Sequence, residues 1–143
     1  MLVSQILRTK GDKVFTITPG ELVGAVAELL HSKGVGAFIV LDAANKVAGI
    51  VSERDIVRAV AAHGAASLAR PVSDFMTSKV IVADPGATVD SLLGMMTDRR
   101  IRHLPVCKND RLVGIVSIGD LVKWKISEVE AEADGLKAYI AAS

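Results

Sequence analysis

One strand-to-helix junction occurs twice in this chain, and that repetition constrains the fold more than any other feature. Residues 49–57 read GIVSERDIV, and residues 114–122 read GIVSIGDLV. The repeat extends beyond the junction, because residues 14–41 match residues 80–107 at a constant offset of 66. Similarity at a fixed spacing predicts two copies of one structural unit.

Each copy has the pattern of a β-α-β-β-α unit. A short strand leads to a Pro-Gly pair, which suits a turn or a helix start. A helix with apolar residues at helical spacing follows, and then two apolar strands joined by a polar turn. A second helix begins at the serine of the repeated junction. The expected elements are strands 14–17, 37–41 and 47–51 with a helix at about 21–33, and strands 80–82, 104–107 and 112–116 with a helix at about 87–99.

The composition fits two such units that share one core. Half of the 143 residues are apolar but only 3% are aromatic, as in buried strands covered by helices. A unit of roughly 60 residues buries little surface alone. We therefore expect an α/β (α+β) fold in which the repeats pack sheet to sheet with pseudo-twofold symmetry and two clefts between them. The expected boundaries are 1–62 for the first repeat, 63–71 for a linker, 72–125 for the second repeat and 126–143 for a C-terminal helical extension.

Charge and cysteine content narrow the class of function. The formal net charge of +1 gives no field that would hold nucleic acid or an anionic membrane. Cys107 is the single cysteine, so no intrachain disulfide can form. His31 and His63 have no partner at metal-ligand spacing, and no signal peptide or membrane span is recognisable. We expect a cytoplasmic protein without a metal, and the lack of a nucleophile–base pair indicates that it is not an enzyme.

The repeated junction has two interpretations. Ser52 and Asp55, like Ser117 and Asp120, have the spacing of a capping box, in which the serine caps the helix and the acid reaches back. Alternatively, the short carboxylate accepts hydrogen bonds from two vicinal hydroxyls, as acidic residues do with ribose. The helix N-terminus beside it offers N–H groups to phosphate. The glycine three residues before each serine leaves room in a cleft wall. This room favours the interpretation of the junction as a ligand-binding site.

The repeated unit resembles the cystathionine-beta-synthase (CBS) domain, and a tandem pair resembles a Bateman module. The resemblance depends on the order of elements, on RHLPV at residues 102–106 and on GIVS-x-x-D, and it covers about Val3 to Lys125. It implies a stand-alone, non-catalytic regulatory or sensor module that binds an adenosine-containing nucleotide between the repeats and modulates a partner protein. AMP, ADP or ATP is the favoured ligand, and NAD(H) or S-adenosylmethionine is the alternative.

The resemblance also implies the residues of the site. In such modules the aspartate of one repeat holds the ribose, while the first strand and the LPV segment of the other repeat wrap the adenine. One site would thus combine Asp55 with residues of the second repeat, and the other would combine Asp120 with residues of the first. The implied ligand-binding residues are Ser52, Arg54, Asp55, Arg58, Val80, Val82, Arg102, His103, Leu104, Pro105, Thr16, Thr18, Ser117 and Asp120.

The two copies differ where a ligand phosphate would lie. If each cleft mixes the repeats, four groups converge near Asp55, whereas the Asp120 cleft receives almost no positive charge. Arginine–phosphate bonds are strong and often bidentate, so a phosphorylated ligand should prefer the Asp55 cleft. For Arg99, Arg100 and Arg102 a solvated basic helix end is the alternative, and it is the one favoured for Arg99. The four converging groups are Arg54, Arg58, Arg102 and His103.

The C-terminal residues carry an apolar stripe whose spacing alternates between four and three. This spacing indicates a helix that runs past its counterpart in the first repeat, with Gly135 as a weak point. The stripe either packs on the module's own surface or joins two chains. The resemblance favours a homodimer that forms a disc of four repeats, and a structural interaction dimer with degenerate pockets is the alternative function. The stripe consists of Val122, Ile126, Val129, Ala133, Leu136 and Ile140.

Overall fold

The computed structural model describes residues 1–11 and 14–142, and the chain divides into two compact units. The units are not the sequence repeats, because each takes the opening segment of the other repeat. The start of the chain belongs with the helices of the second repeat, and residues 72–81 belong with the first. Unit 1 comprises Met1–Asp12, Val82–Lys108 and Val113–Ser143, and unit 2 comprises Lys13–Ile81 and Asn109–Leu112.

Unit 2 is built on a three-stranded sheet with β2 (Ala37–Leu41) at its centre. β1 (Thr16–Ile17) pairs with β2 in parallel, and β3 (Val47–Ser52) pairs with it antiparallel. The sequence of β2, AFIVL, is continuously apolar because both of its faces are covered; Phe38 is 1% exposed. A strand with two buried faces has no polar alternation.

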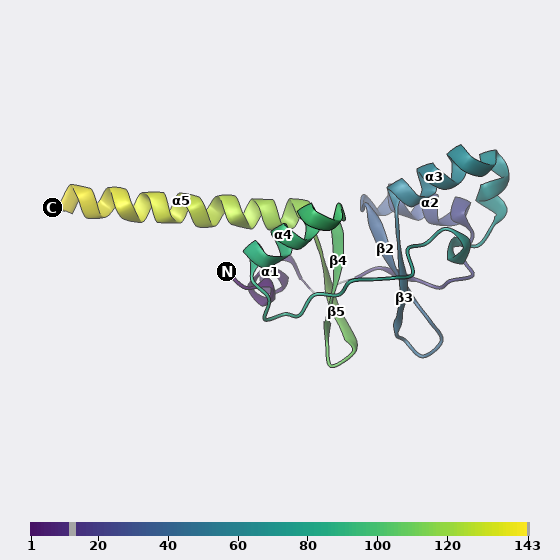
Figure 1. Ribbon diagram of the computed structural model, residues 1–143, viewed down its shortest axis with the longest axis horizontal. Helices are drawn as coiled ribbons and strands as arrows, with labels where there is room; N and C mark the ends of the chain where they lie inside the picture. The colour runs from purple at the N-terminus through teal and green to yellow at the C-terminus, as the bar shows by residue number, and fades with distance from the viewer. Residues whose placement is uncertain (12–13, 143) are drawn as a thin grey trace. The chain divides into compact units, whose positions relative to one another are not determined.

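Two helices and two short 3₁₀ segments complete unit 2 (Figure 1). α2 (Val23–Lys33) buries Val23, Val26 and Leu30 in the same core as Phe38, at helical spacing. It ends at Gly34, whose φ of 63° is left-handed, where glycine costs least. The elements are α2 (Val23–Lys33), α3 (Glu53–His63), η1 (Gly64–Ala69) and η2 (Val72–Asp74).

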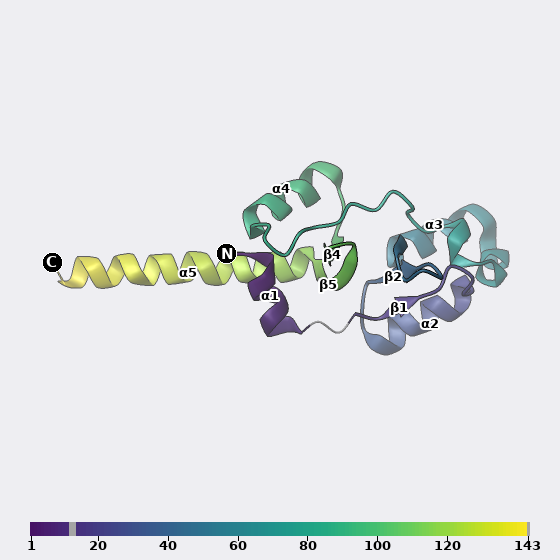
Figure 2. The same cartoon turned by 90° about the horizontal axis from the view of Figure 1, so that it is seen from below.

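The described residues of unit 1 form a two-stranded sheet and three helices, of which the longest, α5 (Ile118–Ala142), packs on α4 (Val89–Arg99) (Figure 2). The N-terminal helix is tied to the start of α4, since the amide of Val3 donates to the carbonyl of Ala87 at 2.9 Å. Its buried residues are Val3 and Ile6. The elements are α1 (Val3–Lys10), α4 (Val89–Arg99), β4 (His103–Lys108), β5 (Arg111–Ser117) and α5 (Ile118–Ala142).

Most expected elements are present, with three differences. The prediction of a strand at 80–82 is wrong. In this segment only Ala83 forms a β-bridge, with Val106, because the turn at Pro85 follows at once. The helix α1 was not expected, although its apolar residues Val3, Ile6 and Leu7 follow helical spacing. The weak point at Gly135 does not break α5, which runs unbroken to Ala142.

Candidate functional site

Both repeated junctions form the capping box that their spacing predicts. The amide of Ser52 donates to Asp55 Oδ2 at 2.9 Å, and the amide of Asp55 donates to Ser52 Oγ at 3.4 Å. In the second repeat the amide of Ser117 donates to Asp120 Oδ2 at 2.9 Å, and the amide of Asp120 donates to Ser117 Oγ at 3.1 Å. In each box the serine amide bonds to one carboxylate oxygen, Oδ2, so capping and ligand binding are compatible.

The space beside the glycine of each junction is filled by another segment of the chain and is not open to a ligand. A Cβ on Gly49 would lie 2.6 Å from Met76 Sδ and 2.9 Å from the carbonyl oxygen of Thr77. A Cβ on Gly114 would lie 2.6 Å from Leu7 Cδ2. The interpretation of these glycines as room in a cleft wall is therefore wrong, because a neighbouring segment of the chain fills the space.

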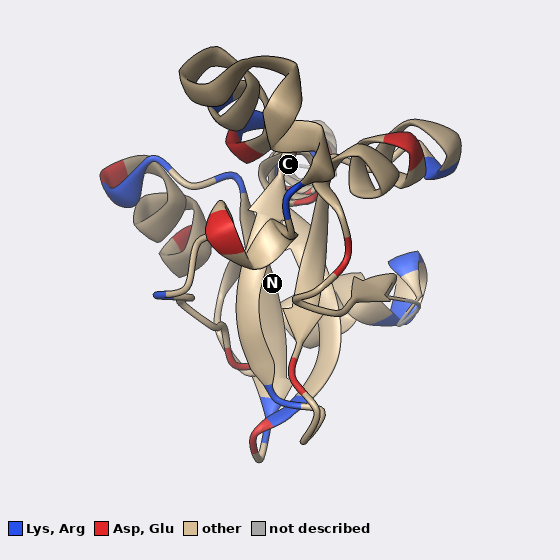
Figure 3. Cartoon of the chain, turned by 90° about the vertical axis from the view of Figure 1, so that its right-hand side faces the viewer, with Lys and Arg blue, Asp and Glu red and all other residues tan. Residues whose placement is uncertain are grey.

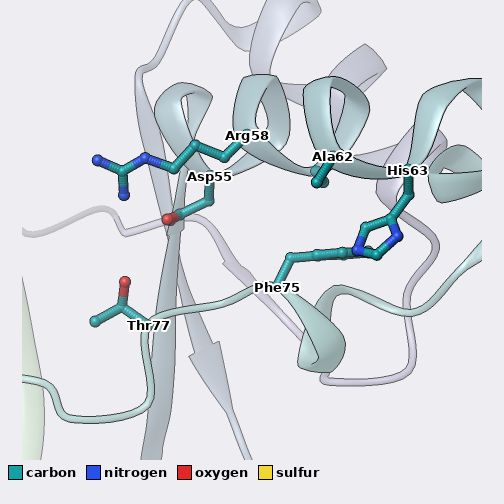
Figure 4. Close-up of a pocket in the computed structure, with 7 residues that line it drawn as sticks. Asp55, Arg58, Ala62, His63, Phe75 and Thr77 are labelled. Atoms are coloured by element: carbon teal, nitrogen blue, oxygen red, sulfur yellow. The ribbon is translucent and has the colours of Figure 1, made fainter.

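A cavity of about 380 Å³ opens beside Asp55 in unit 2 (Figure 4). Asp55, Arg58 and Thr77 lie toward one end of it, and His63 and Phe75 lie together toward the other. Asp55 is only 9% exposed, so the interactions of its carboxylate are largely shielded from water. The lining residues are Asp55, Arg58, Ala59, Ala62, His63, Phe75 and Thr77.

Two segments position this lining. On α3, Asp55, Arg58 and Ala62 follow one another at spacings of three and four, which places them on one face of the helix. The other wall comes from the segment after η2. Thr77 is fixed there by a reciprocal pair of backbone bonds with Ile50 of β3, at 3.0 and 2.9 Å.

The aromatic end of the cavity is held by its neighbours. The ring centroids of His63 and Phe75 are 5.6 Å apart and their planes are tilted by 51°. The guanidinium carbon of Arg70 lies 4.8 Å from the Phe75 centroid, and Arg70 also pairs with Asp74 at 3.0 Å. These contacts fix the ring, because a cation and a second ring both favour specific positions around it.

The structure brings together only part of the residue set implied by the resemblance. Asp55 and Arg58 share the cavity, and Ser52 is bonded to Asp55. Arg54 is exposed on α3 and lies outside the lining. The other unit 2 members are Thr16, Thr18 and Val80, and the unit 1 members are Val82, Arg102, His103, Leu104, Pro105, Ser117 and Asp120. The convergence of Arg102 and His103 on Asp55 would join different units and stays a prediction.

Five lining residues were not expected from the sequence. His63 was considered only as a metal ligand, although it lies two helical turns after Asp55 on the same helix. Helical spacing from Asp55 therefore could have found the α3 members. Nothing local marks Phe75 and Thr77, because tertiary packing brings their segment to β3. The five residues are Ala59, Ala62, His63, Phe75 and Thr77.

The carboxylate of Asp120 already has a cationic partner. Lys10 Nζ of α1 donates to Asp120 Oδ2 at 2.6 Å and to the carbonyl of Ile115 at 2.9 Å. The expectation of almost no positive charge at Asp120 is wrong, because α1 belongs to unit 1. Burial alone would raise the pKa of Asp120, but the bonds from Lys10 and Ser117 outweigh it, so this pKa lies below its ordinary value of 3.8.

Removing this cation should make the protein less stable at neutral pH. Lys10→Met keeps the aliphatic stem but not the charge, and we expect the free energy of unfolding at pH 7 to fall by about 0.5–1 kcal/mol. Because the pKa of Asp120 is lowered on folding, its contribution is present above pH 3.8 and is lost as pH falls through the folded value. Urea denaturation should therefore show the difference between variant and wild type shrinking in acid. The exposed Lys46→Met is the control, and an equal loss there would contradict the assignment.

Charged groups elsewhere are dispersed. Figure 3 shows basic and acidic residues interspersed on helices and turns, with the strands largely uncharged. Within residues 1–11 and 14–142, no group of three His, Cys, Asp or Glu side chains could hold a metal ion. In the same part of the chain, no helix is long and apolar enough to cross a membrane.

The two copies of the unit match a known family. The family model of the CBS domain matches residues 3–62 and 72–127. Together these ranges cover most of the chain, which therefore belongs to the CBS-domain family and is a CBS pair. The α/β fold with a long C-terminal helix, expected from the sequence, is confirmed by its likeness to solved CBS pairs.

Relatives of similar extent are known. The chain is 34% identical over 146 residues to the Arabidopsis thaliana protein named "CBS domain-containing protein CBSX3, mitochondrial", with 96% of this chain and 71% of that protein covered. The CBS-domain protein ATU1752 from Agrobacterium tumefaciens is 47% identical with a TM-score of 0.83, over 85% of this chain and 91% of that one. The CBS pair of protein MJ0100, solved with methylthioadenosine and S-adenosyl-L-methionine, is 26% identical with a TM-score of 0.77, over 87% and 98%.

Proposed function

We propose that this CBS pair is a non-catalytic regulatory module that binds an adenosine-containing ligand beside Asp55 and modulates a partner protein. One observation carries the proposal: a single cavity of unit 2 combines a shielded carboxylate, a cation and an aromatic ring. Its volume of about 380 Å³ is within the range of small-molecule sites. The complex of the MJ0100 pair with two adenosine compounds supports the same ligand class.

The lining suggests which part of such a ligand would bind at each end of the cavity. Ser52 occupies Asp55 Oδ2, and the carboxylate can accept further bonds from ribose hydroxyls. Arg58 reaches outward beside Asp55 (Figure 4) and would pair with a phosphate. The Phe75 end offers apolar surface to a ring. A ligand with both a ribose and a phosphate uses more of this lining than a nucleoside does, which favours AMP, ADP or ATP.

The surroundings of Asp120 support a difference in affinity between the Asp55 site and the Asp120 site. The reason is a bound lysine at Asp120 and not the expected lack of positive charge there. A ligand that binds Asp120 must share the carboxylate with the Lys10 ammonium, which is bonded to Oδ2 at 2.6 Å, or displace it. No such cation is bonded to Asp55 among the described hydrogen bonds and ion pairs, where Ser52 is its partner. We therefore propose that Asp55 marks the preferred site.

A ligand screen at pH 7 tests the function. AMP, ADP, ATP, adenosine, NAD and S-adenosylmethionine are compared by thermal shift and then by calorimetry. At 100 times its dissociation constant a ligand adds about 2.7 kcal/mol to the stability of the folded state, which raises the melting temperature by about 8 °C. We expect such a shift with AMP and a smaller one with adenosine. In Arg58→Ala the affinity for AMP should fall more than that for adenosine, because only the phosphate loses its partner.

No shift with any of the six compounds would contradict the proposal and favour the structural interaction dimer. A shift only with S-adenosylmethionine or NAD would keep the ligand class but reject the preference for AMP, ADP or ATP. The homodimeric four-repeat disc and the cytoplasmic location stay predictions.

A further inference from the structure

The last part of α5 is an exposed helix within unit 1. The first turns of α5 are anchored: Leu121 is fully buried, and Lys125 Nζ lies 2.9 Å from Asp90 Oδ1 of α4. After Glu128 every residue as far as Ala142 is exposed. Figures 1 and 2 both show α5 running on past α1 and α4.

This exposed part carries a continuous apolar seam. Its members follow the spacing of alternate a and d positions in a heptad. Large exposed apolar residues in a row, rather than singly, mark an interaction surface. The seam consists of Ile126 (53% exposed), Val129 (49%), Ala133, Leu136 (60%) and Ile140 (63%).

The exposed part of α5 would be only marginally stable as an isolated helix. An isolated helix of fewer than about 12–15 residues is marginal in water, and Gly135 costs roughly 1 kcal/mol more than alanine would in a helix interior. In the heptad, Gly135 is at an outward c position, where a missing side chain costs no packing at the seam. The helix is therefore suited to being stabilised by a partner that covers the a and d positions.

The charges beside the seam identify the partner and its direction. Glu132 is at a g position and Lys137 is at the e position of the following heptad. In a parallel pair of identical helices, each g residue faces the next e residue of the other helix. Glu132 of each helix therefore faces Lys137 of the other, which gives two attractive pairs. In the antiparallel register that sets Ala133 against Val129, Glu132 would face Glu132 of the second helix and repel it.

We propose that residues 126–140 of α5 form a parallel, in-register coiled coil with a second copy of this chain. Ile126 and Ile140 at a positions with Leu136 at a d position favour two strands over three. The seam spans about two heptads, so it adds to other contacts between the copies. It does not depend on ligand binding at Asp55.

Charge reversal in the full chain tests both the contact and its direction. We expect wild type to dimerise reversibly in sedimentation velocity, and Glu132→Lys to raise the dimer dissociation constant about tenfold. Lys137→Glu should do the same, and the double variant should regain most of the loss. Asp134→Lys, at an outward b position, makes the same change of charge and should have little effect.

Three results would overturn the proposal. One is a wild type that stays monomeric at every concentration. Another is unchanged dimerisation in both Glu132→Lys and the seam variant Leu136→Asp. The third is loss of dimerisation in Leu136→Asp with no effect of Glu132→Lys, which would indicate an antiparallel pair.

Disulfide trapping gives a second, independent measurement. In a Cys107→Ala background, Leu136→Cys puts a thiol at a d position, where identical residues face each other only in a parallel, in-register pair. We expect mild oxidation to link two chains. Ala138→Cys, at an outward f position, is the matched control. Equal cross-linking of the two variants, or none in Leu136→Cys, would overturn the parallel arrangement.

Discussion

Replacing Asp55 with asparagine is expected to lower the affinity of the protein for AMP by tenfold or more. Asp55→Asn keeps the shape of the side chain and one oxygen for the amide of Ser52, which now lies 2.9 Å from Oδ2. It removes the negative charge that strengthens bonds from ribose hydroxyls. A hydrogen bond to a charged acceptor contributes about 1.5–3 kcal/mol, and each 1.4 kcal/mol is tenfold in affinity.

Calorimetry with AMP measures this loss, and the second repeat offers a matched control. Asp120→Asn makes the same change at the same place in the repeated junction, but Asp120 is bonded to Lys10. We expect it to leave the affinity for AMP nearly unchanged. Circular dichroism should show that both variants keep their helices. Unchanged binding in a folded Asp55→Asn would reject the ribose contact, and equal losses in both variants would reject the preference for the Asp55 site.

Replacing Gly49 with alanine is expected to destabilise the protein by about 1–3 kcal/mol, the usual cost of overpacking a core. The new Cβ would lie 2.6 Å from Met76 Sδ and 2.9 Å from the backbone oxygen of Thr77. The methionine side chain can move away, but the backbone oxygen cannot without straining the two bonds between Thr77 and Ile50. Since Thr77 also lines the cavity, affinity for the ligand should fall with stability.

Two other glycines serve as comparisons in the same denaturation experiment. Gly94→Ala in α4 places a Cβ with nothing within 4 Å and should raise the stability by up to about 1 kcal/mol. The three nearest atoms to the new Cβ in Gly114→Ala are Cδ2, Cδ1 and Cγ of the Leu7 side chain. This side chain can turn aside, so the loss should be smaller than that of Gly49→Ala. Wild-type stability in Gly49→Ala would show that the segment at Thr77 shifts at no cost.

The sequence by itself determined the elements whose causes are local. The duplication predicted two matching sets of strands and helices, and the apolar run AFIVL predicted the strand Ala37–Leu41. The spacing of Ser52 and Asp55 predicted the capping box, because capping involves residues of one helical turn. The apolar stripe predicted that α5 continues past the repeat, because helical periodicity is visible over consecutive residues.

Only the tertiary structure decided which segments share a unit, and the site depends on that choice. Lys10 reaches Asp120 across 110 positions of the chain because α1 packs in unit 1, and no local pattern could show this. Phe75 and Thr77 meet α3 because their segment pairs with Ile50 of β3, beside Gly49, where a missing Cβ lets the backbone approach. Local sequence sets the period of each element, whereas long-range packing decides which side chains face a common cavity and which carboxylate is already neutralised by a lysine.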